Sequence, residues 1–488
     1  MYAARAVQRG SVGRPTVVLV LAFAAVHALY LALGVRFDER PLTGFWQHLD
    51  VELLRGDLAR SLLYLHSQPP AWNAYLGLVL KAFPGAHAAA FEAVAIALGL
   101  VLALALASLA TRLGASPWTA AGAAAFFVLS PSFLLHEQIL FYASPVAAAL
   151  AASAVLLDET VRTGRPAACW GLYGIFVVMA GTWSLFHLAY LAMVTAGLLL
   201  LAPERRRVVL RAATPALLLV ACLYAKNLVV FGHFAPSTWV GMNLARITVR
   251  RLPRDARDRL IRARILSPLA AVRPFAPLDA YPPSYEQVTA HADIPCLRDP
   301  LKSTGEPNFN HLAYVSLSEQ YLRDGLAVVR HAPRAYLRGV SEAWLDYASS
   351  ASDSSFLTPN AERARVLREG YDVLVYGRVP GLVLERGGIG YRVYALLILG
   401  LGAAWLFGLH LAARGPEGAR PLAAFLCFSI AWVALVGNGL EVGENNRFRF
   451  VTDPLSAALL AAALQRAAER CGLVRIRSGA ATPAVGSP

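Results

Sequence analysis

A polar stretch at residues 36–70 contains the side chains of this sequence that are best suited to chemistry. It reads RFDERPLTGFWQHLDVELLRGDLARSLLYLHSQPP and follows a single apolar segment. The stretch opens with the acidic pair Asp38 and Glu39 and closes with His66, just before Pro69-Pro70. Carboxylates and an imidazole can take and return protons in general acid–base catalysis. We therefore predict a reaction centre in this stretch.

Other polar side chains stand next to apolar segments further along the chain. His136 and Glu137 form one group, and the motif GENNRFRFVTDP carries Glu444, Arg447 and Arg449. Ionisable groups are costly at a membrane and tend to persist where function uses them. We predict that these groups and the 36–70 stretch share one outward face.

A third group is the arginine-rich segment at 242–264, MNLARITVRRLPRDARDRLIRAR. It contains eight arginines, Arg250 and Arg251 among them, against two aspartates. Arginine binds phosphate through paired hydrogen bonds, whereas basic helix surfaces also bind anionic lipid. The segment is predicted to be either a platform for phosphate or a solvated helix surface anchored to lipid.

The acidic candidates and His66 also have purely structural interpretations. Asp38 and Glu39 could cap a loop helix or pair with Arg36 and Arg40. His66 could hold its loop through a hydrogen bond to the backbone.

The remaining candidates have similar alternatives. His136-Glu137 could start a helix, and Arg447 and Arg449 could neutralise headgroups. Four tryptophans near helix ends are most simply an aromatic belt, although two of them could stack on a sugar. The belt comprises Trp46, Trp72, Trp118 and Trp183, and the first two are the sugar-stacking candidates.

A metal site is a further possibility. The candidate ligands for a divalent cation are Asp38, Glu39, His136 and Glu137, although their spacing matches no recognisable ligand set. The five cysteines are scattered along the chain, which excludes a disulfide framework and a CxxC metal site.

The elements that position these groups are predicted to be membrane helices. Hydrophobic residues make up 57% of the 488-residue chain and charged residues 16%, so the chain is that of a polytopic membrane protein. The formal charge of +14 indicates cytoplasmic loops and contact with anionic lipid or phosphate rather than with nucleic acid.

We predict an all-α fold with about ten crossings. The predicted spans are 16–35, 90–111, 118–135, 139–157, 168–181, 185–202, 208–231, 392–413, 421–440 and 450–468. Arginine-rich loops then fall on one side, the cytoplasm, together with both termini.

Residues 1–35 could also be a secretory signal, but the apolar core is long for one and no clear cleavage site follows, which favours a retained helix.

The predicted organisation has four parts. Residues 1–231 form an N-terminal membrane module with a catalytic first outer loop at 36–89. Residues 232–391 form a mainly helical extracytoplasmic subdomain, 392–468 the last membrane helices and 469–488 a cytoplasmic tail.

The motifs Phe37-Asp38-Glu39 and His66-Ser67-Gln68-Pro69-Pro70 resemble those of the GT-C membrane glycosyltransferases, in the branch of the protein O-mannosyltransferases and lipid A aminoarabinose transferases. That branch usually has His-Pro-Pro without the two inserted residues. The corner containing Ser130-Pro131, Glu137 and Tyr142, and the Glu444, Arg447 and Arg449 motif, add to the resemblance.

The resemblance implies sugar transfer from a polyprenyl-phosphate donor to an acceptor on the extracytoplasmic face, which is a protein, a lipid or a polymer of the cell envelope. Asp38 is then the general base, because a hydroxyl acceptor needs a carboxylate to take its proton, and a single base suits an inverting displacement. Glu39 is the second catalytic residue beside Asp38. Arg447, Arg449 or an arginine of the basic segment would bind the phosphate, with His66, Glu137 and Glu444 lining the site. A flippase of lipid-linked saccharides and a noncatalytic scaffold are the alternatives, although the inverted repeats typical of transporters are not evident.

Overall fold

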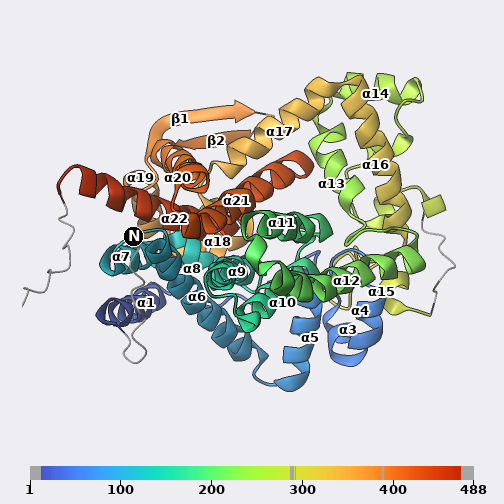
Figure 1. Ribbon diagram of the computed structural model, residues 1–488. Helices are drawn as coiled ribbons and strands as arrows, with labels where there is room; N and C mark the ends of the chain where they lie inside the picture. Colours follow the sequence, from blue (N-terminus) through green and yellow to red (C-terminus); the bar gives the residue numbers. More distant parts are fainter. Residues whose placement is uncertain (1–12, 286–290, 292, 387–388, 474–488) are drawn as a thin grey trace, which may run out of the picture.

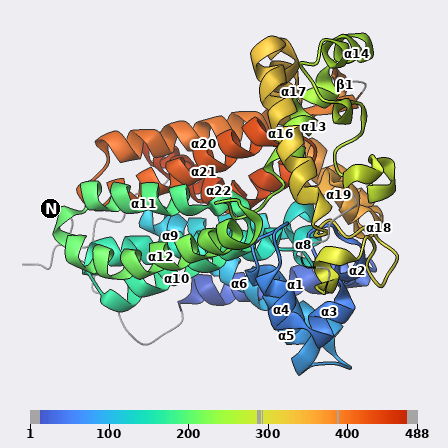
Figure 2. The ribbon, with the colours of Figure 1, turned by 90° about the vertical axis from the view of Figure 1, so that its right-hand side faces the viewer.

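The computed structural model describes residues 13–285, 291, 293–386 and 389–473, and these residues fold almost entirely into helices (Figure 1). A bundle of long apolar helices makes up one end of the molecule. Shorter helices and one β-hairpin gather at the other end (Figure 2).

The bundle is built from eleven helices in the described part of the chain. They are α1 (Arg14–Ala32), α6 (His87–Arg112), α7 (Pro117–Leu129), α8 (Pro131–Glu137), α9 (Ala143–Thr163), α10 (Pro166–Thr182), α11 (Leu188–Leu201), α12 (Arg206–Phe231), α20 (Ala395–Arg414), α21 (Arg420–Leu440) and α22 (Asn445–Arg470). Proline in the first turn starts several of them, because its fixed φ suits that position. Gly164 and Gly232 end α9 and α12 with left-handed φ angles of +66° and +78°.

All ten predicted spans fall on helices, but the count of ten crossings is not confirmed. Among the described residues, six helices are long and apolar enough to cross a membrane, or seven with the bent pair α7–α8. Helices α10 and α11 are apolar but shorter, and α22 carries charged residues in its first turns. The chain is thus a helical membrane protein whose number of crossings is a prediction.

The bend between α7 and α8 measures 65° and lies at Ser130–Pro131. The Ser130 hydroxyl accepts a hydrogen bond from the backbone N–H of Phe133, which caps α8. Helix α8 lies toward the end of the bundle where the shorter helices and the hairpin gather, which we call the polar end (Figure 2).

The basic connections lie together at the opposite end. Arg205 donates hydrogen bonds to the carbonyls of Val161 and Arg162, so the α9–α10 and α11–α12 connections are neighbours. Arg112, at the end of α6, pairs with Asp158 there. Two of the connections that were predicted to be cytoplasmic therefore share one end of the bundle, and the side of the membrane that this end faces stays a prediction.

The polar end holds the other elements. Residues 36–89 contribute α2 (Pro41–Gly44), α3 (Val51–Gly56), α4 (Leu58–Leu63) and α5 (Ala71–Ala82). Residues 232–391 contribute α13 (Val240–Ile247), α14 (Arg254–Arg262), α15 (Pro295–Arg298), α16 (Ala313–His331), α17 (Pro333–Tyr347), α18 (Thr358–Arg363) and α19 (Arg365–Leu374). Residues 239–335 also contain a hydrophobic core of their own.

One feature of this end differs from the expectation. Strands β1 (Arg378–Arg386) and β2 (Ile389–Tyr394) form an antiparallel hairpin in a fold that was predicted to be all-α. Trp46, which precedes α3 in the first outer loop, stacks on Phe275 of the later subdomain, with ring centres 5.4 Å apart.

Candidate functional site

The Asp38 segment lies against the corner that follows α8. The Asp38 N–H donates to the carbonyl of Gln138 at 3.0 Å, and the Leu140 N–H donates to the carbonyl of Asp38 at 2.9 Å. This short parallel bridge joins residues about one hundred positions apart. It brings two of the predicted groups, the acidic pair and the Glu137 corner, next to each other.

The carboxylate of Asp38 is bound by a neighbour on its own loop. Arg40 donates to both oxygens, at 2.8 and 2.5 Å, which is one of the two structural alternatives for this residue. The Arg40 side chain is 66% exposed, and exposed ion pairs are worth only about 0–1 kcal/mol. A polar ligand can therefore replace Arg40 at little cost. Glu39 points elsewhere, with one oxygen 3.5 Å from His87.

Glu137 is completely buried and reaches back to the first membrane helix. Its Oε2 lies 2.5 Å from Nε2 of His27 on α1. Its Oε1 lies against Gly99 of α6 and has no hydrogen-bond partner among the described residues. The carboxylate thus joins three helices of the bundle.

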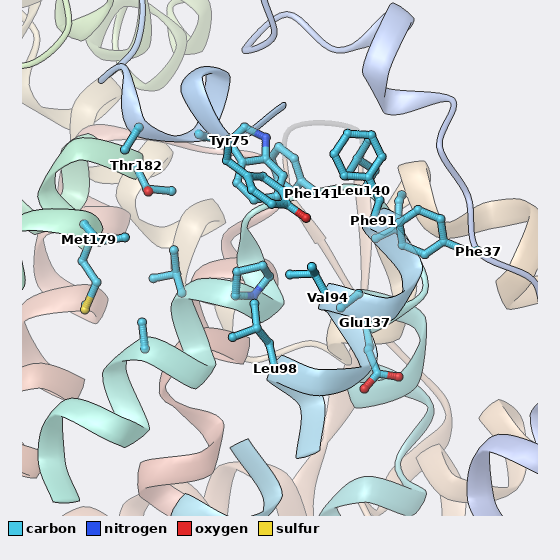
Figure 3. Close-up of a pocket in the computed structure, with 18 residues that line it drawn as sticks. Phe37, Tyr75, Phe91, Val94, Leu98, Glu137, Leu140, Phe141, Met179 and Thr182 are labelled. Atoms are coloured by element: carbon cyan, nitrogen blue, oxygen red, sulfur yellow. The ribbon is translucent and has the colours of Figure 1, made fainter. Parts of the chain in front are cut away.

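An apolar groove of about 230 Å³ lies beside this corner, between α5, α6, α9 and α10. Figure 3 shows the rings of Tyr75, Phe91 and Phe141 gathered on one side of it, while the Glu137 carboxylate points away from them. Phe37 also lines the groove. Successive side chains of an extended segment point to opposite faces, so Asp38 faces the polar side.

Arg447 is a buried cation that contacts the same corner. Its guanidinium lies 4.9 Å from the centre of the Phe141 ring and 5.8 Å from that of Tyr142. The rings of Trp183 and Phe448 complete the enclosure. Such contacts stabilise a desolvated guanidinium by about 2 kcal/mol.

The hydrogen-bonding capacity of Arg447 is only partly used. Tyr142 Oη lies 3.4 Å from one nitrogen, and the Glu444 carboxylate lies 3.6 Å from Nε. Nε is buried and has no hydrogen-bond partner among the described atoms. Glu444 adopts a left-handed φ of +72°, a strained conformation that is common at functional sites.

Arg449 has a different environment, although it follows Arg447 by two residues. It pairs with Asp453 and donates to the carbonyls of Tyr347 and Ser349. These contacts clamp α22 to the end of α17. The arrangement favours a structural role for Arg449 over phosphate binding.

His66 is buried, and both of its ring nitrogens have partners. Nε2 donates to the carbonyl of Asn310, so Nδ1 accepts from the Thr238 hydroxyl. Burial lowers the pKa of this imidazole to about 3, so the ring is neutral. This geometry corresponds to the alternative in which His66 holds the loop.

The four predicted metal ligands do not come together. His136 stacks on Phe450, with ring centres 4.2 Å apart, and its Nε2 donates to the carbonyl of Ala351. Glu137 faces α1, and Asp38 and Glu39 face the polar loops. In the described ranges, no cluster of three or more His, Cys, Asp or Glu side chains could hold a metal ion.

Arg250 and Arg251 line a second pocket, of about 270 Å³, together with Arg246 and Arg273. Its opposite wall is formed by Tyr391 and by Val442 and Gly443, which directly precede the Glu444–Arg447 turn. The arginine-rich segment and the last motif therefore meet.

Several residues of the site were not foreseen. His27 was overlooked in the first span, although a polar residue in a membrane helix is a usable signal. Gly99, Phe141 and Arg273 carry no such signal, because their importance depends on contacts with distant parts of the chain.

Two solved archaeal structures are similar to this chain. The crystal structure of the Archaeoglobus fulgidus oligosaccharyltransferase tethered to an acceptor peptide with the NVT sequon is similar over 93% of this chain and 50% of that one, at 11% identity and a TM-score of 0.42. Archaeal oligosaccharyltransferase AglB from the same organism, in complex with an inhibitory peptide and a dolichol-phosphate, has a TM-score of 0.39 at 10% identity, over 93% of this chain and 51% of that one.

The chain thus spans about half the length of these two structures. A similarity this low transfers no residue's role. No protein-family model matches the chain, and no curated protein sequence matches it either.

Proposed function

We propose that this protein is an integral-membrane glycosyltransferase of GT-C type that moves a sugar from a polyprenyl-phosphate donor to an acceptor at the polar end of the bundle. One observation carries the proposal: Asp38 and Arg447 both contact the corner at 138–142, beside an apolar groove. A base, a cation and a place for a lipid chain are the three things such a transfer needs.

Asp38 is the proposed general base. A hydroxyl acceptor is a weak nucleophile at neutral pH, so a carboxylate within about 3 Å must take its proton as the new glycosidic bond forms. Arg40 holds the Asp38 carboxylate at the polar surface, where a soluble acceptor can approach. The acceptor hydroxyl takes the place of Arg40.

Arg447 is the proposed partner of the donor phosphate. The bond between the sugar and the phosphate breaks in the transfer, so negative charge grows on the leaving phosphate, and a buried guanidinium stabilises it. The unpaired Nε of Arg447 is available for such a contact once Glu444 moves. A single base and a phosphate leaving group suit an inverting displacement.

The apolar groove is proposed to hold the first units of the polyprenyl chain. Its walls are almost wholly hydrocarbon and aromatic, and it lies between helices of the bundle. The donor then enters from the membrane side of the 37–38 segment, while the acceptor reaches Asp38 from the polar side. In this proposal the polar end is extracytoplasmic, and the four-part organisation at 1–231, 232–391, 392–468 and 469–488 is retained.

The test is turnover by the purified full chain with a panel of polyprenyl-phosphate sugars. Asp38→Asn keeps the size of the side chain and its hydrogen bond to Arg40, so it should fold normally and lose at least a hundredfold in rate, typical for a missing general base. Near-normal turnover by this variant would show that the base is assigned wrongly.

A matched control lies in the same loop. Glu52 is exposed, and its one ion pair within the described part of the chain is with Arg55, so Glu52→Gln should leave turnover unchanged. A flippase would instead move an intact lipid-linked sugar across a liposome membrane without consuming it. Translocation without consumption would therefore replace the transferase proposal.

A further inference from the structure

The second pocket, which is lined by Arg246, Arg250, Arg251 and Arg273 and is called the arginine pocket below, has an unusual balance of charge. Arg251 pairs with the buried Glu342 at 2.7 Å, and Arg246 lies 3.8 Å from Glu441. Arg250 and Arg273 have no ion pair and no side-chain hydrogen bond in the part of the chain that the structure describes. Two guanidinium groups therefore line a pocket without a counter-charge.

The arginines also crowd one another. Partial burial and the neighbouring charges of Arg257, Arg273 and Arg251 lower the pKa of Arg250 from its ordinary value. Guanidinium groups stay charged throughout the physiological range, so they cannot relieve this repulsion by losing protons. An anion between them relieves it and gains paired hydrogen bonds.

The pocket is separate from the groove proposed for the donor lipid. The two cavities share no lining residue. The turn at Val442 and Gly443 forms one wall of the pocket, and Arg447 follows four residues after Gly443. Gly443 has a φ of +94°, and a Cβ there would lie 3.0 Å from Arg246 Nη2, so glycine leaves this wall open.

We infer that the arginine pocket binds a phosphate monoester group of a second ligand, which is the acceptor if the proposed transferase function holds. A polyprenyl monophosphate donor has one phosphate, and that phosphate is already assigned to Arg447. Two unpaired guanidinium groups match the charge of about −1.5 to −2 on a phosphate monoester at pH 7. The same chemistry fits a phosphorylated acceptor in water and a phosphorylated lipid headgroup.

The test measures binding rather than turnover. Full-length protein in nanodiscs of zwitterionic lipid is titrated with glycerol phosphate by calorimetry. A parallel arm follows thermal unfolding as phosphatidic acid is added to the nanodiscs. Saturation in the first arm identifies a water-soluble source of the phosphate, and saturation in the second alone identifies a lipid source.

Arg250→Gln and Arg273→Gln should each weaken this binding roughly tenfold to a hundredfold, since each removes hydrogen bonds to a charged group. Both side chains are at least partly open to solvent and have no partner among the described residues, so neither change should impair folding. Arg250→Lys should restore part of the affinity, because it keeps the charge but not the planar fork.

Arg262→Gln is the matched control, an exposed arginine of the neighbouring helix α14 outside the pocket. Binding should be unchanged in this variant. An equal loss in the control, or no saturable binding in either arm, would overturn the inference.

The two proposals fail separately. Asp38→Asn should bind glycerol phosphate or phosphatidic acid as the parent does. If the parent shows no sugar transfer but the pocket variants still lose phosphate binding, the proposed transferase function is wrong and the inference of a phosphate site is kept. If transfer depends on Asp38 but no phosphate binds, only the pocket inference is wrong.

Discussion

Nε2 of His27 lies 2.5 Å from Oε2 of Glu137, so the first membrane helix is tied to the corner beside the proposed base. The contact spans 110 residues of sequence. The other oxygen, Oε1, fits against α6 only because residue 99 is glycine. The position of the corner therefore depends on three helices at once.

Gly99→Ala should disturb this arrangement strongly. A Cβ at this position would lie 1.7 Å from Glu137 Oε1, so the carboxylate or the helix must shift. Overpacking of this kind typically costs about 1–3 kcal/mol. We expect a lower midpoint of thermal unfolding in detergent and slower sugar transfer.

Gly122→Ala is the control for this change. Gly122 lies within α7, and no atom packed against the helix there comes within 4 Å of the place that a Cβ would occupy, so an added methyl group has room. Alanine is also the better helix former, so stability should stay the same or rise slightly. Equal effects of the two substitutions would show that the Gly99 contact with Glu137 is unimportant.

Arg447→Lys should reduce transfer while the positive charge is kept. An ammonium group cannot lie flat against Phe141 and Tyr142, and it cannot form a paired contact with phosphate. We expect kcat/KM for the donor to fall roughly tenfold to a hundredfold, which corresponds to the loss of charge-assisted hydrogen bonds. Steady-state kinetics at varied donor concentration measures this change. An unchanged kcat/KM would show that Arg447 does not bind the donor phosphate.

The helices were the most predictable part of this protein. Hydropathy is a local property, so each predicted span could be placed from its own residues, and each falls on a helix. The start of α14 directly after Pro253 is also a local feature, because proline is tolerated where a helix begins. The number of crossings was less predictable, since short or charged helices such as α11 and α22 do not decide it by composition alone.

The site was predictable only in part. Their residue types made Asp38 and Arg447 candidates for the site. The bridge from Asp38 to residues 138–140, however, is a long-range contact that no local pattern reveals. Arg447 and Arg449 looked equivalent in sequence, and only the carbonyls of Tyr347 and Ser349 separate their roles. Arg273 was not selected at all, because it reaches the arginine pocket from a distant loop.

His66 should make the protein sensitive to acid. Burial lowers the pKa of its ring to about 3, against about 6.5 in the unfolded chain. The unfolded state therefore binds an extra proton between these two pH values. The free energy of unfolding is highest above pH 6.5 and falls as the pH drops toward 3. His66→Gln should show a smaller drop in unfolding midpoint between pH 7 and pH 5.

His331→Gln provides the comparison, because His331 is exposed at the end of α16. It should keep the acid sensitivity of the parent protein. His66→Gln should also lower stability at pH 7, since the links to Thr238 and Asn310 are altered. An unchanged acid response in His66→Gln would mean that the ring is not held neutral.

Trp46→Ala should loosen the first outer loop from the 232–391 segment. The Trp46 ring stacks on Phe275 and lies 5.0 Å from the ring of Phe309, and two such pairs contribute about 1–3 kcal/mol. Phe275 has a left-handed φ of +59°, a strained conformation that packing must maintain. Limited proteolysis should cut the 268–283 connection faster in this variant. Trp118→Ala, at an exposed position of α7, should leave the rate unchanged, and equal rates in both variants would show that Trp46 does not hold the loop.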